Sequence, residues 1–133
     1  MNTKHYTTIE QSKKLLELGL NPESADMVAF PESEDNWEFT ISMPFKEYKG
    51  KKKESIPCWS LGALLEVMPE RISINDEPSY SLVLEKRCGS YNLTYGSYKR
   101  IVDNVTTVGL TPIEAAFSMV VWLLENGYIK KRE

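Results

Sequence analysis

Near the start of the chain, hydrophobic residues recur with the spacing of one helix face. The residues between them are mostly polar or charged, which is typical of an amphipathic helix at the surface of a core. Thr8 and Gln11 have the spacing of a capping box, and Gly19 follows where a helix commonly ends. This pattern predicts a helix at about residues 8–18, with an apolar stripe of Ile9, Leu15, Leu16 and Leu18.

The hydrophobic period then changes from helical to alternating. Residues 21–36 carry two prolines and an acidic cluster, and we interpret them as an irregular connection. From Trp37 to Met43, apolar and polar residues alternate strictly, which predicts a half-buried strand. A short helix over Leu61–Met68 and a short strand at Ile72–Ile74 are expected next.

Two further alternating runs are separated by a glycine-containing segment. Residues 80–84 and 91–95 therefore predict a β-hairpin, and residues 101–108 could add one more short strand. The last predicted helix begins at Thr111-Pro112 and ends at Asn126-Gly127. Its core stripe is expected to consist of Ile113, Ala116, Phe117, Val120 and Leu124.

The elements follow the order α, β, α, β, β, β, α, without regular βαβ alternation. This order favours an α+β fold: a small antiparallel sheet with about three helices packed mainly on one face. The length of 133 residues predicts a single domain over 1–133. Residues 1–7 are expected to form a flexible N-terminal tail, and residues 130–133 a charged C-terminal tail.

The net charge and the lengths of the apolar stretches disfavour two classes, nucleic-acid-binding proteins and membrane proteins. The net charge is −3, whereas nucleic-acid-binding domains usually carry a basic excess. The longest apolar stretch, residues 115–124, is about half of what a membrane span needs, so we expect no membrane partner. The polar N-terminus lacks the apolar run of a targeting signal. Cys58 and Cys88 are therefore expected to be reduced, mostly buried thiols of a cytoplasmic protein.

Candidate catalytic and metal-binding residues are sparse. His5 is the single histidine and lies in the predicted tail, so a Ser-His-Asp or Cys-His site is not expected. The cysteines lack the spacing of a zinc site, and the acidic cluster at 32–35 lacks that of a calcium loop. We expect no metal, no cofactor and no catalytic residue. The sequence leaves open whether two carboxylates come together to form an acid/base site. The candidates are Glu38, Glu66, Glu85 and Asp103.

Two features would suit nucleic acid. A lysine-rich loop precedes the second helix, and tyrosines of the hairpin stand near basic residues, which is the usual recipe for stacking single-stranded bases beside phosphate contacts. A solvated loop and cross-strand packing of the tyrosines explain the same features, and we favour that interpretation. The candidate contacts are Lys49, Lys51, Lys52, Lys53, Tyr91, Tyr95 and Arg100.

The last helix is apolar nearly all round. Beside its stripe it carries Met119, Trp122 and Leu123. Such a helix is either covered on both sides or exposed at a protein interface. An aromatic residue such as Trp122 is a typical interface contact. We therefore consider these three residues a candidate interface, with burial under the Leu61–Met68 helix as the alternative.

Several short segments of the sequence carry a resemblance to other proteins. They include Ile56–Leu65, Leu110–Ala116 and Trp122–Ile129, and the opening Gln11–Leu16 with Leu18–Pro22. In these the chain resembles small uncharacterised proteins of phages and mobile elements in gut anaerobic bacteria. The resemblance implies a cytoplasmic accessory protein and assigns no activity to any residue.

The sequence alone therefore favours a non-enzymatic accessory protein that acts through protein–protein interaction, with another protein or with itself. A nucleic-acid-binding accessory protein that uses the lysine loop and the hairpin tyrosines is the alternative. A small enzyme with paired carboxylates comes third.

Overall fold

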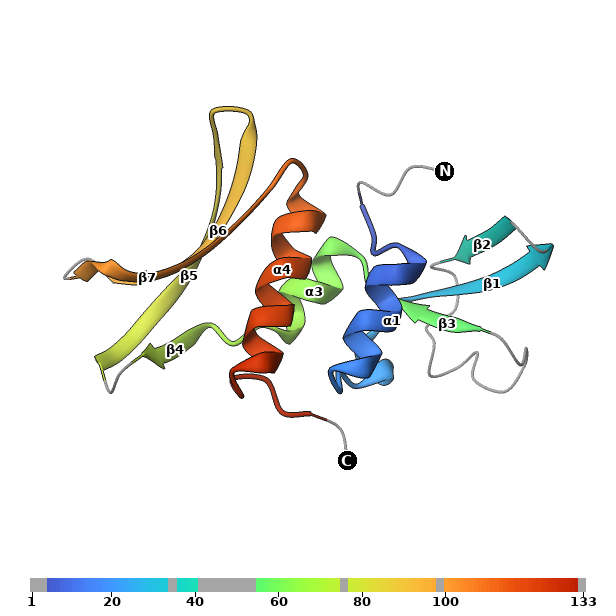
Figure 1. The fold of residues 1–133 in the computed structure, drawn as a ribbon, viewed down its shortest axis with the longest axis horizontal. Coiled ribbons are helices and arrows are strands. Elements are labelled where there is room, and N and C mark those ends of the chain that lie inside the picture. The colour runs from blue at the N-terminus through green and yellow to red at the C-terminus, as the bar shows by residue number, and fades with distance from the viewer. Residues whose placement is uncertain (1–4, 34–35, 41–54, 75–76, 98–99, 132–133) are drawn as a thin grey trace.

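The computed structural model describes residues 5–33, 36–40, 55–74, 77–97 and 100–131. Within these residues the chain forms three α-helices, a short 3-10 helix and seven strands. The strands make two antiparallel sheets, one of three strands and one of four. Figure 1 shows the helices in the middle of the molecule, with one sheet on either side. The α+β class is confirmed, and the division of the strands into two sheets is an addition to it.

The helices begin where their capping residues predict. α1 (Ile9–Glu17) has the complete capping box between Thr8 and Gln11. Ser60 caps α3 (Leu61–Val67) by accepting a hydrogen bond from the backbone N–H of Ala63. α4 (Pro112–Glu125) is capped by Thr111. The carboxylate of Glu114 does not bond back to this cap residue and instead accepts from the backbone N–H of Leu110, at 2.9 Å.

The three-stranded sheet corrects the prediction for residues 21–36. This segment contains the 3-10 helix η1 (Pro22–Ser24) and the strand β1 (Met27–Ser33). β1 is central, between β2 (Asn36–Thr40) and β3 (Ile56–Cys58). Its first residues, Met27 to Ala29, are all buried, so the alternation that normally reveals a strand is missing. β2 confirms the predicted strand up to Thr40, and residues 41–43 lie outside the described part.

The four-stranded sheet has the order β4-β5-β6-β7. It comprises β4 (Arg71–Ile74), β5 (Glu77–Arg87), β6 (Ser90–Ser97) and β7 (Arg100–Gly109). The predicted hairpin is β5–β6, closed by a two-residue turn. Cys88 and Gly89 have φ of 51° and 79° there, the positive values that a type I′ turn requires. The strand predicted at 101–108 is β7.

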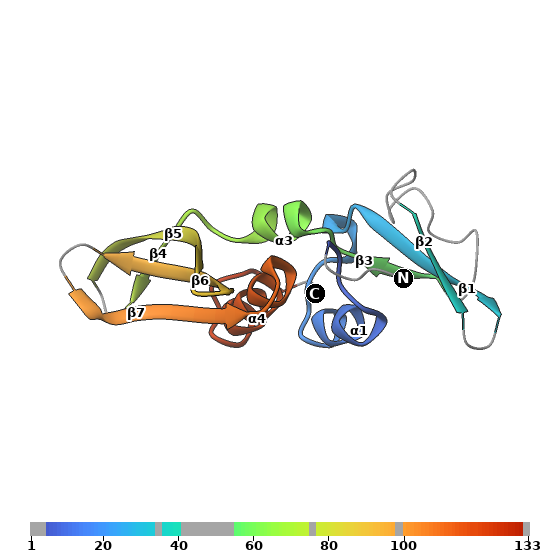
Figure 2. The same ribbon diagram turned by 90° about the horizontal axis from the view of Figure 1, so that it is seen from above.

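α4 is the central element of the fold. It contacts β6 and β7 on one side and α3 and α1 on the other, and Figure 2 shows it between the large sheet and α1. Gly109 allows this close packing at the end of β7. A Cβ atom there would lie 2.6 Å from the backbone nitrogen of Ala115. The main core cluster therefore extends from α1 through α3 and α4 to the sheet.

The N-terminal segment is not a tail throughout residues 1–7. Residues 5–7 run beside the residues that precede α3: Tyr6 forms a β-bridge with Ser60, and Thr7 is fully buried. The backbone N–H of Thr7 donates to the carbonyl of Trp59 at 2.9 Å. These long-range hydrogen bonds are invisible to a local pattern. Residues 1–4 lie outside the described part, as do 132–133, while Lys130 and Lys131 are exposed.

Candidate protein-binding surface

Two of the three interface residues predicted on α4 are buried. Met119 and Leu123 are each 0% exposed, as are Ala115, Ala116 and Val120. The helix is covered by the sheet on one side and by α3 and α1 on the other, so it buries two stripes instead of one. The prediction that Met119 and Leu123 face a partner is therefore wrong, and burial within the chain explains their apolar character.

Trp122, the third residue, is only half-buried. Its ring stacks on that of Tyr128, with centroids 5.3 Å apart and an interplanar angle of 13°. The hydroxyl of Tyr128 in turn donates to the backbone carbonyl of Ser73, at 2.9 Å. The stacking on Trp122 therefore helps to hold Tyr128, which follows α4, against β4. Its ring has an intramolecular partner, which weakens the case for it as an isolated interface contact.

The tyrosines predicted to stack bases have separate environments. Tyr95 is 0% exposed, and its hydroxyl donates to the carbonyl of Pro69 at 2.5 Å. Burial raises its pKa to about 12. It is a core residue and cannot stack a base. Tyr91 is half-buried, with the ammonium group of Lys86 5.5 Å from its ring centroid.

The remaining basic candidates cannot be placed against Tyr91. Arg100 is described only as the first residue of β7. Lys49, Lys51, Lys52 and Lys53 lie outside the described residues.

The structure exposes a different surface, on the side of the large sheet away from α4. Leu93 and Tyr95 of β6 point into the core, so the alternate residues of β5, β6 and β7 point outward. Val83 and Val108 on this side are 52% and 58% exposed. We call this surface the outer face. It consists of Val83, Glu85, Arg87, Asn92, Thr94, Thr106 and Val108.

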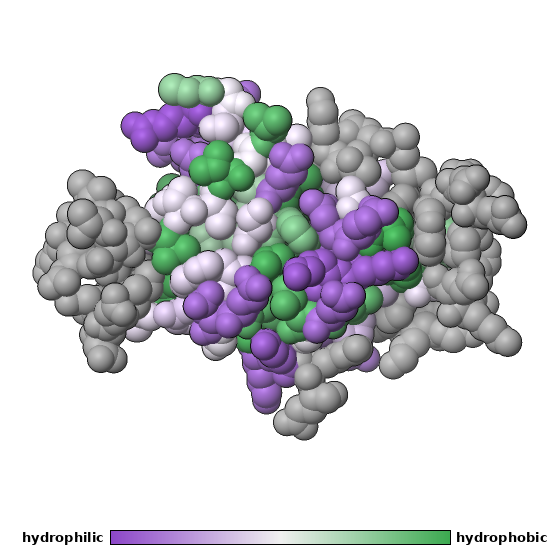
Figure 3. All heavy atoms as spheres, viewed as in Figure 1, coloured by the Kyte–Doolittle hydropathy of each residue, from purple (hydrophilic) through white to green (hydrophobic). Residues whose placement is uncertain are grey.

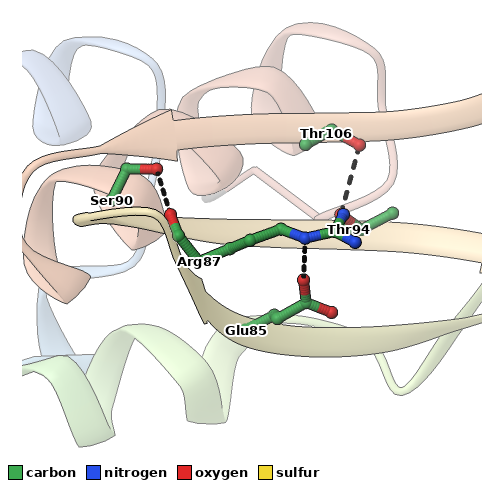
Figure 4. A network of polar contacts seen from close by, with 5 residues as sticks. All are labelled: Glu85, Arg87, Ser90, Thr94 and Thr106. Atoms are coloured by element: carbon green, nitrogen blue, oxygen red, sulfur yellow. Dashed lines mark hydrogen bonds and ion pairs between the residues drawn. The ribbon is translucent and has the colours of Figure 1, made fainter.

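Polar contacts on the outer face are few and local (Figure 4). The hydroxyls of Thr94 and Thr106 are 3.1 Å apart across β6 and β7. Glu85 and Arg87 form an exposed ion pair at 3.3 Å toward the hairpin turn. Between these groups the methyl groups of valine and threonine meet water. The described contacts of the outer face are therefore one threonine pair and one ion pair, beside the exposed side chains of Val83 and Val108.

Leu110, the residue that follows β7, is a further exposed hydrophobic residue. It is 77% exposed, the most of any large hydrophobic residue in the described part of the chain. Leu84, 41% exposed, lies on the opposite side of β5 near the hairpin turn. From the viewpoint of Figure 1, Figure 3 shows small groups of hydrophobic residues between strongly hydrophilic ones.

A sequence signal for the outer face does exist. From Val105 to Val108, β7 has β-branched residues at every position, hence on both of its sides. α4 covers only one side, and the other stays open.

The carboxylates considered for catalysis do not form a buried pair in the described part of the chain. Glu66 is exposed on α3, and Glu85 is exposed on β5 beside Arg87. The side chains of Glu38 and Asp103 lie outside the description. Within the described residues no group of three or more His, Cys, Asp or Glu side chains could hold a metal ion.

A buried polar cluster lies where α1, β1, β3 and α3 meet. The hydroxyl of Ser12 donates to the carbonyl of Thr8 at 2.7 Å and lies 2.8 Å from the hydroxyl of Thr7. Asp26 accepts hydrogen bonds from the backbone N–H and the hydroxyl of Ser60, at 2.9 and 2.5 Å. Every one of these groups has a partner. The single histidine, His5, lies close by in the chain path, since the backbone N–H of Leu61 donates to the His5 carbonyl at 3.2 Å, while the Ser60 hydroxyl donates to Asp26. The cluster therefore fixes the junction of the elements.

The two cysteines are free and differ in exposure. Cys58 is buried, whereas Cys88 is exposed in the hairpin turn, so the prediction of mostly buried thiols is right for Cys58 alone. Burial raises the pKa of the Cys58 thiol to about 11, despite hydrogen bonds from Ser12 and Thr7 that lower it. Since the thiolate is the reactive form, we expect Cys88 to be alkylated in the native protein. Cys58 should react only after unfolding, which a timed thiol titration with and without denaturant can check.

The raised pKa of Cys58 also predicts a pH dependence of stability. The folded state holds this proton more tightly than the unfolded state, whose thiol pKa is near 9.0. The stabilisation is complete below pH 9 and is lost as the pH rises through about 11, by roughly 3 kcal/mol in total. Urea denaturation of the wild type and of Cys58→Ala at several pH values measures it. A constant difference between the two proteins from pH 8 to about 11 would contradict the prediction.

Comparison with known proteins adds no relative. No protein-family model, curated protein or solved structure matches the chain. In the described part of the chain, no helix is long and apolar enough to cross a membrane.

Proposed function

We propose that this protein is a non-enzymatic interaction module that binds another protein through the outer face of its large sheet. The observation that carries the proposal is the exposure of Val83 and Val108, 52% and 58%, on one side of a sheet whose other side is packed. Exposed β-branched residues on a regular strand surface lose water favourably when a partner covers them.

The chemistry of the outer face indicates the kind of partner. Threonine and valine present methyl groups on this face, and the Glu85–Arg87 pair toward the hairpin turn carries both signs of charge. A surface of this kind suits a protein surface that is apolar in its centre and polar around it. The adjoining Leu110 would add the most exposed of the large hydrophobic side chains in the described part of the chain to the contact.

The biological setting belongs to the same proposal. We include in the proposal the setting that the resemblance to phage and mobile-element proteins would imply, a cytoplasmic accessory role. Neighbouring genes in a phage commonly serve one process, so the genes beside this one would identify the process and the candidate partners.

Nucleic-acid binding is the second candidate, and one observation favours it. Lys86 and Tyr91 lie side by side near the hairpin turn, with a cation above an aromatic ring. A base could stack where the lysine now lies. A salt-dependent affinity for a mixed-sequence single-stranded oligonucleotide, lost in Tyr91→Ala, would support this function. Binding that is absent at low salt would remove it.

A photo-crosslinking experiment tests the protein-binding proposal. A photoreactive amino acid at position 83 should form a specific adduct with one protein in the cells that carry the gene. The matched control is the same amino acid at Glu10, which is exposed on α1. Val83→Lys in untagged competitor protein should fail to suppress the adduct, whereas wild type should suppress it. Equal adducts at positions 83 and 10, or none at position 83, would contradict the proposal.

A further inference from the structure

The edges of the two sheets differ in how they are protected against pairing with another chain. Proteins usually guard an edge strand with charge, proline or short length. β3 contains Pro57, and the sequence of β2 includes the charged residue Glu38. β4 is only four residues long and begins with Arg71. These three edges are guarded.

β7 is the exception among the described strands. It forms the other edge of the large sheet, is ten residues long and pairs only with β6 in that sheet. Figure 2 shows it along the outer border of the sheet. Its last five residues, Val-Thr-Thr-Val-Gly at 105–109, contain no charge and no proline. Four of them are β-branched and favour extended backbone.

We infer that the partner at this edge is a second copy of the chain, joined by antiparallel pairing of β7 with β7; this inference rests on the proposed protein-binding function. A two-fold axis at Thr107 pairs the whole 105–109 segment with itself. Thr106 then lies opposite Val108 of the second copy, and Val105 opposite Gly109. No like charges are opposed within this segment, which is the electrostatic condition for self-pairing.

The pairing also accounts for the exposure of Val108. Directly opposed residues of antiparallel strands point to the same side of a sheet, so Thr106 and Val108 would meet across the new interface on the outer face. Val108, 58% exposed in one chain, gains the methyl group of Thr106 of the second copy as a neighbour. The two sheets become one continuous sheet of eight strands, four from each copy. A contact of about five residues per chain is small, so the dimer is expected to depend on concentration.

A charge-complementation experiment tests this inference on the full chain. Sedimentation or light scattering over a range of concentrations should show a monomer–dimer equilibrium. In Thr106→Lys/Val108→Lys, two lysine pairs oppose each other, and the dimer Kd should rise by about tenfold or more. Thr106→Glu/Val108→Glu should raise the dimer Kd to a similar extent, because two pairs of glutamates then oppose each other. Mixing the two variants should restore a dimer, because each lysine then faces a glutamate.

Val83→Lys is the matched control, since Val83 lies on the same outer face but on the interior strand β5. Edge pairing predicts that Val83→Lys still dimerises. A dimer lost equally in Val83→Lys would mean face-to-face stacking of sheets and overturn the β7 pairing while keeping the outer face as the binding surface. If the chain stays monomeric at all concentrations but crosslinks to another protein at position 83, the inferred dimer is wrong and the proposed protein-binding function stands. Circular dichroism of each variant checks that the fold is kept.

Discussion

Trp59→Ala is expected to lower the free energy of unfolding by about 3–5 kcal/mol. Trp59 is 0% exposed and is among the largest fully buried side chains in the described part of the chain. Its indole N–H donates to the hydroxyl of Ser24 at 2.9 Å, so truncation leaves both a cavity and a lost hydrogen bond. Urea denaturation followed by circular dichroism measures the change.

Trp59→Phe separates the two contributions. Phenylalanine fills much of the space but cannot donate to Ser24, so it should cost clearly less than alanine, with about 1 kcal/mol from the hydrogen bond. Ser24→Ala removes the same hydrogen bond from the other side, and also the one that the Ser24 hydroxyl donates to the carbonyl of Asn21, so it should cost at least as much as this hydrogen bond. A Trp59→Ala protein as stable as wild type would mean that Trp59 does not lie in the core.

Leu123→Ala is expected to cost about 2–5 kcal/mol of monomer stability, because Leu123 is 0% exposed within the main core cluster. Trp122→Ala should cost less, since Trp122 is only partly buried, with its ring stacked on that of Tyr128. Neither change should alter the oligomeric state of the folded protein. Thermal denaturation and light scattering of both variants provide the measurement.

This pair of variants decides the role of the α4 residues that the sequence marks as an interface. If Trp122→Ala dissociated an oligomer and left a stable monomer, Trp122 would belong to the binding surface after all. If Leu123→Ala were neutral, the placement of α4 between sheet and helices would be wrong.

The local elements could be predicted because their causes lie within a few residues of sequence. Thr8 with Gln11 caps α1, Ser60 caps α3, and Thr111-Pro112 begins α4. The hairpin β5–β6 follows from two alternating runs around Gly89, whose positive φ completes a tight turn. In each case a side chain satisfies or shapes nearby backbone, so the pattern and the structure coincide.

β1 shows where local patterns fail. Met27, Val28 and Ala29 are consecutive and buried, since the strand is central in its sheet and is packed on both sides. A run of this kind lacks period two, and Pro31 near its end suggests a loop. The pairing with β3, some thirty residues away, decides that the segment is a strand.

The candidate surface depends even more on tertiary structure. The sequence by itself determined that α4 is apolar all round and that β7 is β-branched on both sides. Which of these two surplus apolar surfaces meets water was decided by packing: α3, α1 and the large sheet enclose Met119 and Leu123, while only one side of β7 receives a helix. Hydrophobic burial is non-directional, so a pattern specifies that a surface favours cover but not which element supplies it.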